Sequence, residues 1–220
     1  MIKLVQRIRQ IVARHRLRGV EFSIVSNDCW GAHVYQRLAL PYNTPFIGLF
    51  FSPSAYLRLL EDFQGWMSFP LRFKPESDEA WINRDREVPG QRWPIGCLGD
   101  AVEIQFKHYQ SEAEAAEKWN RRRARLVTRP ERLFFKFGDR DGCTTEQFNR
   151  FSRLPLPNKV LFTTRKDWTS DCTVRIPMDE PSVPDGLSLS YISPRQFDVA
   201  DWLAGGTGRP KRLASLLNCL

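Results

Sequence analysis

Long apolar runs are absent from this 220-residue chain, and cysteine is scarce. No segment approaches the roughly 20 apolar residues that a membrane-spanning helix needs, and the N-terminus lacks the apolar core of a secretory signal peptide. The five cysteines are Cys29, Cys97, Cys143, Cys172 and Cys219. Because they are odd in number, widely spaced and free of any C-x-x-C pair, they disfavour a disulfide framework or a structural zinc site. We therefore expect a cytoplasmic protein with reduced thiols and no metal.

The common catalytic and nucleotide-binding motifs are missing as well. The sequence contains no G-x-x-x-x-G-K-[ST] loop, no H-E-x-x-H helix and no G-x-S-x-G elbow. P-loop, zincin and serine-hydrolase assignments therefore lose their usual sequence support. The composition, with 42% hydrophobic and 26% charged residues, is typical of a globular chain with its own core.

Positive charge is in excess. The sequence has 33 Lys and Arg against 25 Asp and Glu, which gives a net charge of +8. This balance favours anionic partners, namely phosphates, acidic glycans, lipid head groups or nucleic acid. Nucleic acid is the least favoured of these, because neither an aromatic-basic RNA signature nor a DNA-binding helix pair is recognisable.

Residues 1–18 form a distinct basic segment. They hold six Lys and Arg and no acidic residue, and their apolar residues recur near helical spacing. This pattern predicts a basic amphipathic helix. It has two interpretations: a helix packed on the domain with an arginine-rich solvent face, or peripheral contact with the anionic inner face of a membrane.

From residue 19 onward the sequence alternates between strand and helix patterns. Strands are predicted at 20–26, 46–51, 69–73, 102–107, 133–137 and 160–164, and helices at 32–38, 55–63, 111–125, 144–154, 197–203 and 209–217. Segment 74–99, rich in proline, glycine and charge, is predicted to be an extended surface connection. The alternation predicts an α/β fold: a single three-layer α/β/α domain over 19–220, with a mostly parallel or mixed sheet and an irregular part over 167–220.

Candidate chemistry follows three of the predicted strands. In open parallel sheets, ligands collect beyond the carboxyl ends of the strands. Residues 26–31 follow the first strand, His108 follows the strand at 102–107, and residues 139–143 follow the strand at 133–137. Cys29 stands just before a predicted helix, where backbone N–H groups favour a thiolate or a bound anion.

Together these loops predict a nucleophile, a base and an orienting carboxylate, the arrangement of a catalytic triad. The nucleophile is Ser26 or Cys29, the base is His108, and the carboxylate is Asp139 or Asp141. The residues expected to bind substrate are Asn27, Trp30 and Arg122. Each residue also has a structural interpretation, because Asn and Asp are common in turns, Cys and Trp are often core residues, and arginines at a helix end are often solvated.

Several strings in the chain resemble a bacterial family of unknown function. They are SNDCWG (26–31), LPYNTPFIGLFF (40–51), PIGCLGD (94–100), HYQSEAEAAEKWNRRRARL (108–126), DRDGC (139–143) and NKVLFTTR (158–165). Members of this family are described as exopolysaccharide or capsule biosynthesis proteins and as acetyltransferases, and the resemblance spans residues 20–166. It implies an α/β/α domain encoded among surface-polysaccharide genes. The positions that match are Ser26, Asn27, Cys29, Trp30, Gly31, Cys97, Asp100, His108, Trp119, Arg122, Asp139 and Asp141.

The leading hypothesis from sequence is an O-acetyltransferase that modifies a sugar of a bacterial surface polysaccharide or its precursor. His108 would deprotonate a sugar hydroxyl or the Ser26/Cys29 nucleophile, and arginines would hold the phosphates of an acetyl-CoA donor or an anionic acceptor. Two alternatives stay open. One is a sugar transferase that uses a nucleotide-sugar donor, and the other is a non-enzymatic module that binds an acidic glycan or a phosphorylated ligand.

Overall fold

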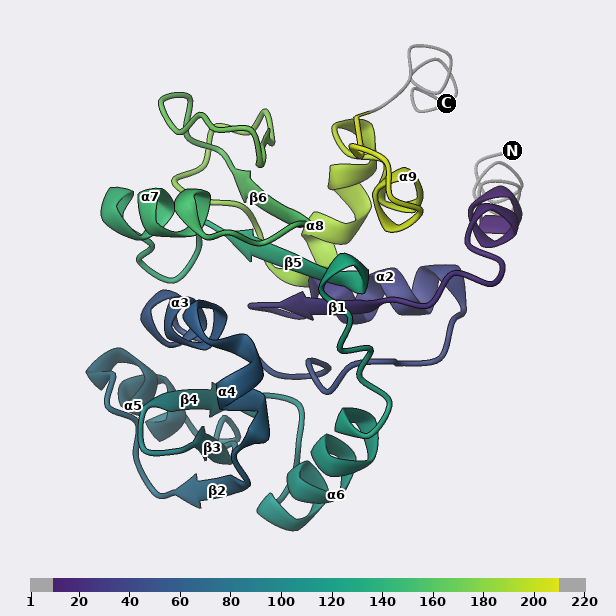
Figure 1. Cartoon of the computed structure of the whole chain (residues 1–220). Helices are drawn as coiled ribbons and strands as arrows, with labels where there is room; N and C mark the ends of the chain where they lie inside the picture. The colour runs from purple at the N-terminus through teal and green to yellow at the C-terminus, as the bar shows by residue number, and fades with distance from the viewer. Residues whose placement is uncertain (1–9, 210–220) are drawn as a thin grey trace.

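The computed structural model of the chain describes residues 10–209 and has the predicted α/β architecture (Figure 1). Four parallel strands form one sheet in the order β1-β5-β6-β7, and three antiparallel strands form a second sheet in the order β2-β3-β4. The strands are β1 (Ser23–Ser26), β2 (Leu71–Lys74), β3 (Ile95–Leu98), β4 (Val102–Gln105), β5 (Leu133–Gly138), β6 (Lys159–Thr163) and β7 (Thr173–Arg175).

The helices cover both faces of the parallel sheet and surround the smaller one (Figure 1). They are α2 (Trp30–Leu38), α3 (Pro53–Glu61), α4 (Phe63–Ser68), α5 (Ala80–Glu87), α6 (Glu112–Arg123), α7 (Thr145–Arg153), α8 (Gly186–Ile192) and α9 (Val199–Leu203), with short 3-10 turns at Pro130–Arg132 and Ser193–Arg195. Residues 10–16 are also helical.

Alternate residues of the parallel strands enter two different apolar clusters. Ile24 and Phe134 pack with α2, α8 and α9, whereas Val25 and Phe135 pack with α3 and α7. Successive strand side chains point to opposite faces, so both faces of this sheet are dry and covered. The three α/β/α layers expected from the sequence are therefore present.

The smaller sheet is inserted between β1 and β5. Strands β2, β3 and β4 lie between them in sequence, and the apolar side chains of β4 belong to the same cluster as those of α3. A single antiparallel bridge joins Phe50 to Gln105. Helix α3 thus packs on the parallel sheet and on the inserted sheet, and it fixes the position of the two sheets relative to each other.

Side chains cap the N-termini of three of the predicted helices. The hydroxyl of Ser52 accepts a hydrogen bond from the backbone N–H of Ala55, with Pro53 at the first helical position, and the Ser111 hydroxyl accepts one from the N–H of Glu114. Thr144 forms a complete capping box with Gln147. These caps explain why α3, α6 and α7 begin within two residues of their predicted starts.

Three expectations for the insert are wrong. Residues 46–51 do not form a strand, because Gly48 adopts a positive φ of 72° and only Phe50 makes a bridge. Segment 74–99 is not a surface connection, since it contains α5 and the fully buried strand β3. The alternation of apolar and polar residues along 102–107 predicts a strand with one buried face, but β4 is buried on both faces, because the side chains of Glu103 and Gln105 are themselves hydrogen-bonded inside. The helix predicted at 209–217 lies almost wholly outside the described residues.

The tight contact between Gly186 and the loop after β1 generates a stability prediction. A Cβ at Gly186 would stand 2.4 Å from the backbone N of Trp30 and 2.8 Å from the carbonyl carbon of Cys29. Because backbone cannot yield as a side chain does, we expect Gly186→Ala to lower the free energy of unfolding by about 2–4 kcal/mol in urea titrations. Gly90→Ala, with open space around it, is the control and should cost about 1 kcal/mol for its positive φ alone. Equal losses in the two variants would contradict the packing argument.

Candidate functional site

The loops after β1 and β5 leave the sheet toward opposite faces. Helix α2, which follows β1, packs in one apolar cluster, and α7, which follows β5, packs in the other. Adjacent parallel strands whose following helices diverge in this way form the switch point at which open α/β sheets usually bind ligands. We call the residues just beyond β1 and β5, 27–29 and 139–143, together with the side chains that contact them, the switch point.

A buried ion pair lies inside the switch point. The Nζ of Lys136, on β5, donates to the Oδ2 of Asp28 at 2.6 Å and to the Oδ1 of Asn27 at 3.1 Å. The other Asp28 oxygen accepts from the Ser26 hydroxyl at 3.2 Å and from the Trp30 backbone N–H at 3.0 Å. Lys136 is fully buried, so its charge is balanced inside the protein rather than by water.

The pKa values of the pair reflect this setting. Burial alone raises the pKa of Asp28, but the charge and hydrogen bond of Lys136, with the Trp30 N–H, outweigh it and leave that pKa below its usual value. Burial lowers the pKa of Lys136, and the charge of Asp28 opposes the change. A carboxylate with three donors around it is held in its charged form, which makes Asp28 a structural anion at neutral pH.

The two candidate nucleophiles are poorly placed for covalent chemistry. Burial, followed by the charge of Asp28, raises the pKa of the Cys29 thiol to about 12, and its Sγ lies 4.0 Å from the carbonyl oxygen of Leu49. The thiol is therefore protonated at neutral pH, whereas a cysteine nucleophile reacts as the thiolate. Ser26 is fully buried and donates its hydroxyl to Asp28.

The two candidate carboxylates differ sharply. Asp139 is buried, and it accepts hydrogen bonds from the Thr163 hydroxyl and from the backbone N–H groups of Thr164 and Val183. These three bonds tie β5 to β6 and to the segment before α8. Asp141 adopts a positive φ of 57°, and burial raises its pKa, with the nearby charges of Asp28 and Asp85 adding to the rise and those of Arg140 and Lys136 opposing it.

His108 is exposed and lies three residues beyond the end of β4. Its backbone N–H donates to the carbonyl of Gly48, the neighbour of the Leu49 carbonyl that faces Cys29. Partial burial, then the charges of Lys107 and His33, lower the pKa of His108. Its imidazole is therefore neutral at pH 7 and forms no hydrogen bond with another residue within 10–209.

The structure brings some of the predicted site residues together and separates others. Cys29 and Asp141 surround the Asp28–Lys136 pair, and His108 approaches the same region through the 48–49 segment. Among the described residues, no hydrogen bond links His108 to any of the candidate nucleophiles or carboxylates. The residues therefore share one region without forming a connected triad.

The predicted substrate-binding residues make internal contacts. Trp30 is 1% exposed, and its Nε1 donates to the hydroxyl of Ser193 at 3.2 Å. Arg122 donates to the Tyr109 hydroxyl at 2.6 Å and lies over the Tyr42 ring. Asn27 accepts from Lys136, as described above, and its backbone carbonyl accepts from the N–H of Phe51.

Three residues of this region were not singled out from the sequence. They are Lys136, Arg140 and Asp185, which stands beside Cys29 and Arg140. The signal for Lys136 was available, because a lone lysine in the apolar strand LFFKFG must either face solvent or be paired. Within the described part of the chain, no cluster of His, Cys, Asp and Glu has the make-up of a metal site.

Comparison of the sequence with known proteins shows which family the chain belongs to. Residues 1–204 match the family described as "Domain of unknown function (DUF1919)". The chain belongs to this family. An uncharacterized protein of Haemophilus influenzae (strain ATCC 51907 / DSM 11121 / KW20 / Rd) is 35% identical over 150 residues, which cover 68% of this chain and 65% of the relative.

The chain thus spans just under two thirds of that relative's length. Membership in a family of unknown function is confirmed, and neither description names an activity. The acetyltransferase and polysaccharide assignments stay predictions. None of the helices over residues 10–209 has the length and apolar character to cross a membrane.

The buried ion pair generates a second stability prediction. Lys136→Met leaves Asp28 charged and unpaired in the interior, so we expect the free energy of unfolding to fall by about 3–5 kcal/mol. The double variant Asp28→Asn with Lys136→Met removes both charges and should regain much of that loss. Urea titrations of the two proteins measure the difference. A double variant no more stable than Lys136→Met would show that pairing is not what stabilises the switch point.

Proposed function

We propose that this protein transfers an acyl group, most simply acetyl, to a hydroxyl of a bacterial surface polysaccharide or its precursor, with His108 as the general base. The observation that carries the proposal is the exposed imidazole of His108, whose pKa is lowered by partial burial and by the charges of Lys107 and His33. A base must be unprotonated at the working pH and reachable by the hydroxyl it serves, and this imidazole meets both conditions.

The environment of Cys29 and Ser26 favours direct transfer over a covalent acyl-enzyme. The Cys29 thiol is protonated and Ser26 is buried, so the acceptor hydroxyl itself is the nucleophile in this proposal. The imidazole of His108 takes the hydroxyl proton, the hydroxyl oxygen forms a bond to the acyl carbonyl carbon, and the carbon–sulfur bond of the thioester donor breaks. The departing coenzyme A thiolate then receives the proton from the imidazolium.

Cations flank this region and suit a phosphorylated donor. Arg140 is half-buried at the switch point, where its Nε lies 3.9 Å from an oxygen of Asp141. Lys107, next to His108, is exposed, with its Nζ 3.7 Å from the centre of the Trp93 ring. Guanidinium and ammonium groups are the usual protein ligands of phosphates, so these two residues support binding of coenzyme A phosphates.

The first test is acetyl transfer from acetyl-labelled acetyl-CoA to bacterial surface polysaccharides. We expect His108→Ala to lower the transfer rate by about 10²–10⁴-fold, the usual contribution of a general base, with an unchanged melting temperature because the side chain is exposed. An unchanged rate would remove His108 from the mechanism. Salt-sensitive glycan binding without turnover in the unaltered protein would instead favour the non-enzymatic binding module.

The second test is the pH dependence of kcat/KM. Activity requires neutral His108, so kcat/KM should fall as the pH drops through the pKa of this imidazole and reach a plateau above it. Because burial, Lys107 and His33 all lower that pKa, the midpoint should lie below 6.5, the ordinary value for histidine. Cys29→Ala should keep the same profile and rate, whereas loss of activity in that variant would restore the covalent mechanism.

A further inference from the structure

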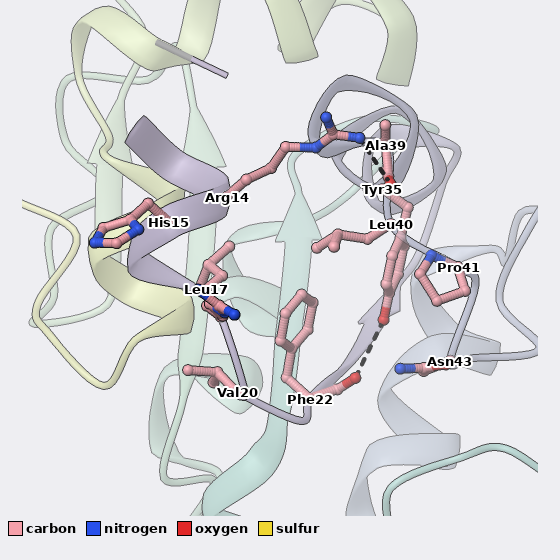
Figure 2. Close-up of a pocket in the computed structure, with 12 residues that line it drawn as sticks. Arg14, His15, Leu17, Val20, Phe22, Tyr35, Ala39, Leu40, Pro41 and Asn43 are labelled. Atoms are coloured by element: carbon pink, nitrogen blue, oxygen red, sulfur yellow. Dashed lines mark hydrogen bonds between the residues drawn. The ribbon is translucent and has the colours of Figure 1, made fainter. Parts of the chain in front are cut away.

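A groove lies at the other end of β1, away from the switch point. It has a volume of about 590 Å³ and lies between the N-terminal helix and the C-terminal end of α2 (Figure 2). Its floor is apolar: Leu17, Phe22 and Leu40 point toward one another, and the ring of Tyr35 stands beside them. The groove therefore offers a surface that suits hydrocarbon.

The rim of the groove is basic. Arg14, His15 and Arg18 line it, and no acidic residue does. Arg14 reaches across to α2, where its guanidinium donates to the carbonyls of Leu38 at 2.6 Å and Ala39 at 3.2 Å (Figure 2). Arg18 is exposed and forms no ion pair with a residue that the structure describes. Its charge is available to an anion from outside.

The helix beside the groove is anchored on one side and apolar on the other. Arg16 forms ion pairs of 3.0 and 2.9 Å with Asp198 and Asp201, which fix the helix to α9. One turn earlier, Ile11 and Val12 are 58% and 52% exposed. Exposed apolar residues among arginines on a fixed helix are typical of segments that lie in a membrane interface.

We propose that this groove and residues 10–18 form a docking site for the anionic phospholipids of a membrane surface. The arginines would meet the phosphate groups, Ile11 and Val12 would enter the acyl boundary, and the groove would accept part of an acyl chain. Nucleic acid, the other abundant polyanion, offers nothing for the exposed aliphatic side chains, so charge and apolarity together favour lipid. The inference is independent of the proposed transferase activity.

Co-sedimentation of the full chain with lipid vesicles tests the proposal. We expect binding to vesicles of phosphatidylcholine mixed with phosphatidylglycerol, and little binding to phosphatidylcholine alone. Arg18→Glu changes the local charge by two units and should weaken binding roughly 30-fold. Ile11→Ser with Val12→Ser should weaken binding by about tenfold or more, because less apolar surface is then transferred from water to the acyl region.

Arg153→Glu is the matched control. Arg153 ends α7, on the opposite face of the parallel sheet, and this variant changes the net charge by the same two units. It should bind anionic vesicles as the unaltered protein does. A loss equal to that of Arg18→Glu would overturn the proposal, since net charge alone would then explain binding. So would binding to a single-stranded oligonucleotide without binding to vesicles, or full competition by free glycerol phosphate.

Discussion

The Lys136–Asp28 ion pair constrains the whole carboxyl end of the parallel sheet. A fully buried ammonium is tolerated only when an opposite charge and further hydrogen bonds compensate for its lost hydration. Lys136 projects from the centre of β5, so its charge partner must lie on a neighbouring segment. That partner is Asp28, in the loop after β1, 108 residues away in sequence. That requirement fixes the path of residues 26–28 and the first turn of α2.

Neighbouring contacts reinforce the same loop from the other side. The close approach of Gly186 seats the start of α8 on the backbone of Cys29 and Trp30, and Asp139 ties β5 to β6 and to the segment before α8. Such compact, hydrogen-bonded surroundings leave few groups free for chemistry. The reactive candidates are therefore the exposed ones, above all His108, which reaches this rigid region from the inserted sheet.

The parts predicted from sequence were those with strong local signals. Apolar runs bounded by capping residues located β5, α7 and β6, because period and caps act within a few residues of each other. The apolar character of residues 46–51 predicts a strand, but it serves packing in a loop that Gly48 bends. Segment 74–99 has the opposite character: α5 buries only Ile82, so its sequence is nearly all polar and lacks the pattern of a packed helix. The role of Asp28 depended on a partner distant in sequence, which no local pattern reveals.

Strand β1 also sets the relation between the two proposed sites. It has four residues, so its first and last Cα atoms lie about 10 Å apart. The groove lies at its amino end and the switch point at its carboxyl end, with α2 running between them. A membrane docked at the groove would therefore leave the switch point directed away from the lipid surface. An acceptor reached from there would be a sugar that projects from the membrane, rather than a group at the level of the lipid phosphate.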